Sequence, residues 1–143
     1  MTEPLRFLLV QQQADLAWTE VLARSIDRTQ GVLTLALPAD LENLDVPPFA
    51  LVLLDLTGLD DPVSRVREIR RRDPEARVVV FAPAPHVKQG RELYRENIID
   101  YVRKLGDEDG LHKILVDNLS RRPLNQRWRR EDLPGEDNTS AVG

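Results

Sequence analysis

Residues 49–56, FALVLLDL, form the most hydrophobic stretch of the chain and decide its fold. The apolar residues follow one another without the alternation of a half-exposed strand, so a strand formed here must be covered on both faces. Such a strand is typical of the centre of a parallel sheet that has helices on both sides. Asp55 interrupts the run, and a buried carboxylate at this position needs a partner, water or a function.

Shorter apolar runs on both sides of this segment predict four more strands, and stretches of helical spacing separate them. The strands are expected at residues 5–10, 32–37, 76–81 and 98–102. Helices are expected at residues 14–28, 62–72, 86–97 and 111–119, with at most a short helix within residues 38–48. Five strands that alternate with five helical segments predict an α/β fold, a doubly wound, flavodoxin-like, five-stranded parallel sheet of the (β/α)5 type.

The composition fits one globular domain. The 143 residues are 41% hydrophobic and 31% charged, and they include no cysteine, which excludes disulfides and thiolate metal sites. We expect a domain at residues 4–121 and a flexible polar tail at residues 122–143. No apolar run is long enough to cross a membrane, and the first residues lack the cleavage site of a signal peptide, so a cytoplasmic protein is expected.

The segment after the first strand excludes two common nucleotide sites. It reads QQQAD at residues 11–15, without the glycines that let a pyrophosphate approach the backbone, and the chain has no Walker loop. The two histidines, His86 and His112, are far apart in the sequence and form no metal site by themselves. No serine stands in a nucleophile-elbow motif. The sequence therefore predicts no enzymatic activity.

Two charged residues stand at the ends of neighbouring strands. Asp55 closes the third strand and Lys104 follows the fifth, and ligands of open α/β sheets bind at the carboxyl ends of the strands. An opposite charge within ~4–6 Å favours the ionised carboxylate, so the two side chains can form a pair. Two interpretations remain open at this point. The pair is either a functional site or an ion pair that only satisfies two charges at the edge of the sheet.

Three segments contain the third, fourth and fifth predicted strands and the residues that follow them. They are FALVLLDLTG at residues 49–58, RVVVFAP at residues 77–83 and IIDYVRKL at residues 98–105. Together they resemble the receiver domain of bacterial two-component response regulators, and the resemblance covers residues 5–119. It implies that Asp55 is the phospho-acceptor position, that Lys104 contacts the phosphoryl oxygens and that Tyr101 is the aromatic residue that switches rotamer.

Three departures from the family's pattern predict an impaired site. Gln11 and Gln12 stand where the family has two acidic residues that hold Mg²⁺, and neutral amides supply no charge to that ion. Ala82 stands where a serine or threonine hydroxyl bonds the phosphoryl group, and Leu105 stands where a proline follows the lysine. We therefore expect a degenerate pseudo-receiver with no cofactor, in which metal-dependent phosphorylation of Asp55 is slow or absent.

The alternative hypothesis is a working phospho-acceptor with unusual metal binding. Mg²⁺ would then be held weakly by the Asp55 carboxylate and the Thr57 backbone oxygen, with Gln12 as a further ligand. Phosphoryl transfer depends on that ion because it neutralises charge on the transferred group. Treatment with a small phosphodonor and Mg²⁺ separates the two hypotheses.

Signalling without a phosphate switch requires a protein partner. The resemblance places the contact surface on the helices at residues 86–97 and 111–119 and on the last strand. Its expected residues are Arg91, Tyr94, Arg95, Tyr101 and Arg103. Plain solvent surface is the alternative for this face. A homodimer is a second form of partnership that the sequence leaves open, whereas the net charge of −4 argues against nucleic acid.

The end of the chain combines opposite charges with an aromatic residue. Residues 121–130, RRPLNQRWRR, hold five arginines and Trp128, and EDLPGED at residues 131–137 adds four acids. The 22 residues after Arg121 are too few for a DNA-binding output domain, so output is expected through a partner, self-association or the tail. Trp128 is expected to dock on the domain or on a partner. A solvated tail and a nucleic-acid contact are the alternatives.

Overall fold

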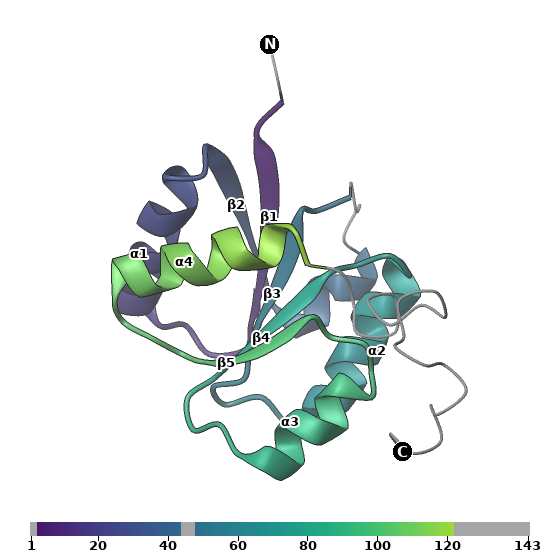
Figure 1. The fold of residues 1–143 in the computed structure, drawn as a ribbon. Coiled ribbons are helices and arrows are strands. Elements are labelled where there is room, and N and C mark those ends of the chain that lie inside the picture. Colours follow the sequence, from purple (N-terminus) through teal and green to yellow (C-terminus); the bar gives the residue numbers. More distant parts are fainter. Residues whose placement is uncertain (1–2, 44–47, 122–143) are drawn as a thin grey trace, which may run out of the picture.

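The computed structural model describes residues 3–43 and 48–121. Within these residues, five strands alternate with helices along the chain (Figure 1). The elements are β1 (Leu5–Gln11), α1 (Leu16–Asp27), β2 (Gly31–Ala36), the 3-10 helix η1 (Pro38–Asn43), β3 (Leu51–Asp55), α2 (Pro62–Arg72), β4 (Val78–Ala82), α3 (Val87–Tyr94), β5 (Asp100–Arg103) and α4 (Glu108–Leu119). The predicted α/β fold is confirmed, and in the segment expected to hold at most a short helix the described residues 38–43 form the 3-10 helix.

Most of the predicted elements differ by a few residues from their bounds in the structure, and two neighbouring ones show the reason most clearly. The helix expected at residues 86–97 ends at Tyr94, and the strand expected from residue 98 begins at Asp100. Asn97 lies between them with a φ of 67°, in the left-handed region that asparagine tolerates better than most residues. The chain therefore turns sharply where the pattern suggested a continuous helix that leads into the strand.

The five strands form one parallel sheet in the order β2-β1-β3-β4-β5. The order reverses between β1 and β3, and in open α/β sheets ligands bind at the carboxyl ends of the strands near this reversal. The register pairs Gln11 with Asp55, Asp55 with Phe81, and Ala82 with Arg103. The last residues of the inner strands therefore lie side by side at one edge of the sheet.

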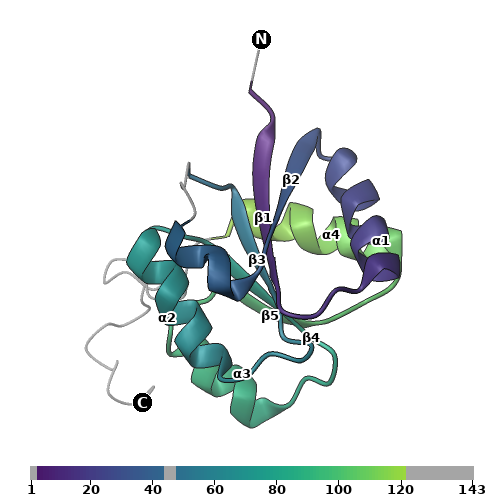
Figure 2. The same cartoon turned by 180° about the vertical axis from the view of Figure 1, so that it is seen from behind.

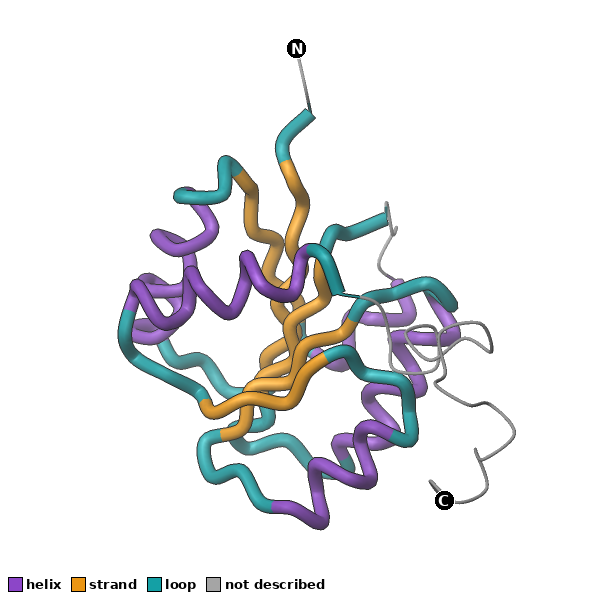
Figure 3. The backbone as a smooth tube through the Cα atoms, in the orientation of Figure 1, coloured by secondary structure: helices purple, strands orange, loops and turns teal. Residues whose placement is uncertain are grey.

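The sheet divides two apolar cores. Helices α1 and α4 pack on one face through residues such as Leu22, Ile26, Leu111 and Leu115. Helices α2 and α3 and the 3-10 helix cover the other face, as Figures 2 and 3 show. Both faces of β3 are buried, as its unbroken apolar run predicts. No helix in residues 3–43 or 48–121 is long and apolar enough to cross a membrane.

Trp18 anchors α1 to the sheet. The side chain is buried, its ring meets Phe81 edge-on at 5.2 Å between centroids, and its indole Nε1 donates a hydrogen bond to the Leu105 carbonyl at 2.7 Å. One residue on the first helix thus ties the sheet to the loop that follows β5. The α1 helix begins next to this loop, which brings its N-terminal residues close to the ends of the strands.

Candidate functional site

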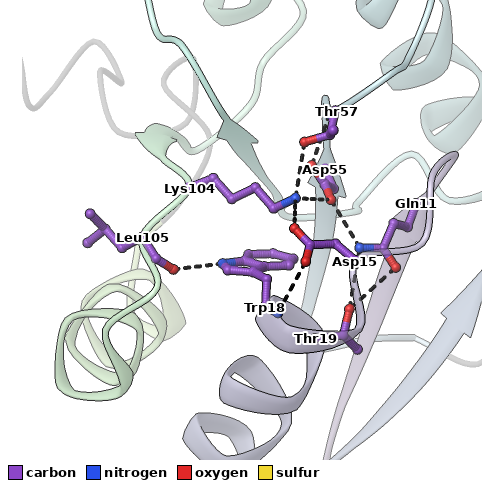
Figure 4. A network of polar contacts seen from close by, with 8 residues as sticks. All are labelled: Gln11, Asp15, Trp18, Thr19, Asp55, Thr57, Lys104 and Leu105. Carbon is purple, nitrogen blue, oxygen red and sulfur yellow. Dashed lines mark hydrogen bonds and ion pairs between the residues drawn. The ribbon is translucent and has the colours of Figure 1, made fainter.

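Asp55 ends β3 with its side chain fully buried. Its Oδ1 accepts a hydrogen bond from the Thr57 backbone nitrogen at 3.0 Å. Its Oδ2 accepts one from Gln11 Nε2 at 3.0 Å and lies 2.9 Å from Lys104 Nζ (Figure 4). The exposed fraction of the Asp55 side chain is 0%. Both carboxylate oxygens therefore have protein partners, and no part of the group faces solvent.

Lys104 is the centre of the polar network. Its Nζ lies 2.9 Å from Asp55 Oδ2, 2.7 Å from Asp15 Oδ2 and 3.0 Å from Thr57 Oγ1. These three acceptors match the three donors of an ammonium group. The side chain is only 7% exposed, and the ammonium also lies 4.8 Å from the centroid of the Trp18 ring, within the range of a cation–π contact. The ammonium is thus fully satisfied by the protein.

The network favours the charged forms of Lys104 and Asp15. Burial by itself lowers the pKa of Lys104, but the hydrogen bonds to Asp15 and Asp55 outweigh that effect and raise the pKa above its ordinary value. The hydrogen bond from Lys104 lowers the pKa of Asp15. Lys104 therefore stays protonated at neutral pH, which disfavours any role as a nucleophile.

Asp15 is the site residue that the sequence reasoning missed. It is the N-cap of α1, where its Oδ1 accepts a hydrogen bond from the Trp18 backbone nitrogen at 3.3 Å, while its Oδ2 binds Lys104. A signal was present, because an aspartate directly before a helical pattern is a typical N-cap. A helix that follows the first strand begins at the carboxyl edge of the sheet, which is where Lys104 was expected.

The two glutamines of the predicted acidic-pair positions separate in the structure. Gln11, the last residue of β1, donates to Asp55 and lies within 3.5 Å of the Thr19 hydroxyl. Gln12 lies in the following turn and is exposed. The strand ends between them, so only Gln11 reaches the carboxylate. Gln11 binds Asp55 as a hydrogen-bond donor, a role that a carboxylate at this position would not fill.

Ala82 ends β4 with its methyl group buried. Its backbone carbonyl accepts a hydrogen bond from the Lys104 backbone nitrogen at 2.9 Å, which continues the sheet, but its side chain offers no hydrogen bond. The hydroxyl that meets the Lys104 ammonium belongs to Thr57 and is held by that contact. The polar network therefore does not extend from Asp55 into β4.

The arrangement of oxygen ligands around Asp55 in this structure does not fit Mg²⁺. Magnesium prefers six oxygen ligands in near-octahedral geometry, usually with one or two carboxylates among them. The two nearby carboxylates, Asp15 and Asp55, both bind the same ammonium. Across residues 3–43 and 48–121, no three histidine, aspartate or glutamate side chains gather as a metal site. The protein supplies its own cation to these carboxylates.

Tyr101 belongs to a separate environment. Its hydroxyl donates to Gln89 Oε1 at 2.8 Å and accepts a hydrogen bond from the His86 backbone nitrogen at 3.0 Å, so it is fixed to the start of α3. The ring lies against Gly90, where a Cβ would come within 3.0 Å of it. A larger residue than glycine would therefore displace the tyrosine ring.

A groove of about 480 Å³ lies beside Tyr101. Its lining consists of Pro85, His86, Val87, Gly90, Arg91, Tyr94 and Tyr101. Of the predicted partner-contact residues, Arg91 and Tyr94 line the groove with Tyr101, whereas Arg95 and Arg103 are exposed outside its lining. Trp128, the remaining predicted contact residue, lies outside the described residues.

Comparison with solved structures identifies the fold. A response regulator from Thermotoga maritima matches 82% of this chain and 99% of its own, with a TM-score of 0.70 and 15% sequence identity. HP1043, an orphan response regulator of H. pylori, matches 80% of this chain and 96% of its own, with a TM-score of 0.68 and 15% identity.

A third structure carries ligands. A response regulator from Burkholderia pseudomallei, with a phosphorylated aspartic acid, a calcium ion and citrate, matches 81% of this chain and 69% of its own, with a TM-score of 0.65 and 19% identity. No protein-family model matches the sequence, and no curated protein matches it. On the evidence of its sheet order and of these structures, the chain has the fold of a response-regulator receiver domain.

Proposed function

We propose that the protein is a cytoplasmic signalling module of the receiver type that acts by binding a protein partner, without metal-dependent phosphorylation of Asp55. The observation that carries the proposal is the state of the Asp55 carboxylate. It is fully buried, and both of its oxygens are bound within the protein. They accept hydrogen bonds from Gln11 and Thr57 and form an ion pair with Lys104. This is the pseudo-receiver hypothesis of the sequence, now supported by a specific network of contacts.

Phosphorylation of Asp55 would require this network to open. A carboxylate oxygen must leave a protein donor before it can attack a phosphoryl group, and removing one partner of a buried ion pair costs about 3–5 kcal/mol. The transferred group also needs cations to neutralise its charge. Among the residues that the structure describes, Lys104 is the ammonium paired with Asp55, and that ammonium is shared with Asp15.

The contacts that would link a phosphoryl group on Asp55 to Tyr101, the expected switch residue, are also incomplete. Ala82 has no hydroxyl to bond a phosphoryl group, and the Tyr101 hydroxyl is bound to Gln89 and to the backbone of His86. None of the hydrogen bonds of Tyr101 involves Asp15, Asp55 or Lys104. Even an attached phosphoryl group would therefore lack the contact through which it could move the tyrosine.

The groove beside Tyr101 is the partner surface in this proposal. Val87 and Tyr94 supply apolar area, and Arg91, which is exposed in the lining, adds a cationic group. The whole chain carries a net charge of −4, so this cation is a local feature of the groove. The partner that fits is a protein segment with apolar side chains next to acidic ones.

Intact-mass measurement after incubation with a small phosphodonor and Mg²⁺ tests the first part of the proposal. We expect no increase in mass by one phosphoryl group. We also expect no change in the amide chemical shifts of the protein when beryllofluoride is added. The Asp55→Asn variant is the control, because it removes the acceptor and keeps the shape of the side chain. An adduct on the wild type that is absent from Asp55→Asn would overturn the proposal.

A phospho-acceptor receiver is the second candidate function, and the position of Asp15 favours it. Asp15 places a second carboxylate on the same ammonium as Asp55, and both would face a cation if Lys104 moved away. In that case an adduct would form on the wild type and be lost in Asp15→Asn. An adduct that persists in Asp15→Asn would exclude Asp15 as part of the phosphorylation site.

A further inference from the structure

The outer edge of β2 is unpaired and apolar. The strand lies at one margin of the sheet, where it bonds β1 on its inner side and no described strand on its outer side (Figure 1). No charged residue occurs between Arg28 and Asp40. Val32 is 46% exposed, Leu35 is 58% exposed, and Leu37 is also exposed. Every second residue of such an edge strand turns its N–H and C=O groups outward, ready to pair with another strand.

The opposite edge of the sheet shows the protection that β2 lacks. Strand β5 has four residues and includes Asp100 and Arg103. Asp100 binds Asn118 Nδ2 at 2.8 Å and Arg121 Nη1 at 3.0 Å, so groups from the end of α4 lie over this edge. Short strands, charges and covering segments are the usual means by which proteins prevent pairing at an edge. Strand β2 has six residues and no charged side chain, and no strand of the described residues pairs with its outer side.

We propose that two copies of the chain associate through their β2 strands, antiparallel and about a two-fold axis, and join two five-stranded sheets into one. Across a two-fold axis, the β2 strand of one copy pairs with the β2 strand of the other copy. Because this edge carries no charge, the two identical edges do not repel each other. The proposal does not rest on the proposed function, since it uses neither Asp55 nor the groove beside Tyr101.

The charges around β2 select this orientation. Asp40 and Glu42 follow the strand and are exposed. A parallel arrangement would bring these acids of the two copies together, whereas an antiparallel arrangement moves them to opposite ends of the contact, roughly 20 Å apart for six residues. Like charges in contact destabilise an interface, so the antiparallel pair is the one expected.

The size of the contact suits a reversible dimer. A strand of six residues spans roughly 20 Å, and a sheet with one helical layer on each face is roughly 30 Å thick. Their product, roughly 600 Å² per copy or roughly 1,200 Å² in total, is the most that this edge can bury and lies at the lower limit of specific interfaces. Contacts at this limit are typical of weak, transient complexes, so we expect a dissociation constant on the order of micromolar.

Sedimentation velocity of the 143-residue chain, from about 1 μM to about 500 μM, tests the proposal. We expect a monomer of 16.3 kDa at the low end and a species of twice that mass at the high end. Val32→Lys places a charge on the edge and is expected to weaken dimerisation about tenfold or more. Val116→Lys is the matched control, because Val116 on α4 has the same 46% exposure but lies away from β2.

Amide hydrogen exchange of the wild type gives a second test that needs no variant. Exchange within Gly31–Ala36 is expected to slow as the protein concentration rises, while exchange within β5 stays unchanged. A chain that remains monomeric at about 500 μM would overturn the proposal and leave the edge to a different protein. A dimer with no concentration-dependent protection of β2, or equal weakening by Val32→Lys and Val116→Lys, would also overturn it.

Discussion

The Asp55 site and the groove beside Tyr101 draw on residues three positions apart on the same segment, yet they are opposites. Around Lys104, charged groups are buried and bound to one another. Around Tyr101, apolar and basic side chains border an open groove. A site whose groups are all satisfied by the protein has little left to offer a ligand, whereas exposed apolar surface gains free energy when it is covered. This contrast underlies our proposal that a partner binds at the side of the sheet and not at the ends of the strands.

Removal of Lys104 should have the largest effect on stability. Lys104→Ala leaves the Asp55 carboxylate buried without its cation, which is expected to lower the free energy of unfolding by about 3–5 kcal/mol. Urea unfolding measures the change. Lys113→Ala is the control, because Lys113 forms an exposed pair with Asp117 on α4 and its loss should change stability little. Equal losses in the two variants would show that the Asp55 network does not hold the strand ends together.

Asp55→Asn should have a smaller effect than the loss of the lysine. The amide keeps the volume of the side chain, and Asp15 still neutralises Lys104. The free energy of unfolding is expected to fall by about 1–3 kcal/mol, because the amide nitrogen cannot accept the hydrogen bonds that the carboxylate accepted. The same urea titration measures it. A loss as large as that of Lys104→Ala would mean that Asp15 does not compensate the ammonium.

Tyr101→Phe tests whether the groove is independent of the site. The variant loses the hydrogen bonds to Gln89 and to the His86 backbone, and a loss of about 0.5–1.5 kcal/mol is expected. Amide chemical shifts should change at the start of α3 and remain constant near Asp55 and Lys104. Shifts that spread to Thr57 would contradict the separation of the two regions.

Acid should weaken the contact between Asp15 and Lys104. Because Lys104 lowers the pKa of Asp15, the unfolded chain binds a proton to this residue at a higher pH than the folded chain does. The contribution of Asp15 to stability is therefore complete above its ordinary pKa of 3.8 and is lost as pH falls through the lowered folded pKa. Unfolding measured as a function of pH should show a shallower acid slope in Asp15→Asn. An unchanged slope would place the acid dependence in other carboxylates.

The fold could be predicted from patterns that depend on few residues. An unbroken apolar run predicts a strand that is covered on both sides, and both faces of β3 are buried. Bounds were less accurate where a single backbone angle decides them, as at Asn97, because the left-handed turn leaves no trace in apolar spacing. Propensity alone does not reveal such a turn.

The site was predictable only in part. Asp55, Gln11 and Lys104 were placed together correctly, since the carboxyl ends of parallel strands share one edge. Asp15 was missed because it comes from the cap of a helix, four residues beyond the strand. The groove could not be predicted, since its shape depends on how closely the Tyr101 ring lies against Gly90. Contacts within one strand edge follow from topology, and contacts between packed side chains do not.

The position of Trp18 gives the molecule a built-in optical probe. The centroid of the indole ring lies 4.8 Å from the Lys104 ammonium, and the indole Nε1 donates a hydrogen bond to the Leu105 carbonyl. Its fluorescence emission therefore depends on the charge and hydration around Lys104. The chain has two tryptophans, and Trp128→Phe would leave Trp18 as the sole emitter. Quenching and wavelength shifts recorded on that background would then report directly on the surroundings of Lys104, without an attached dye.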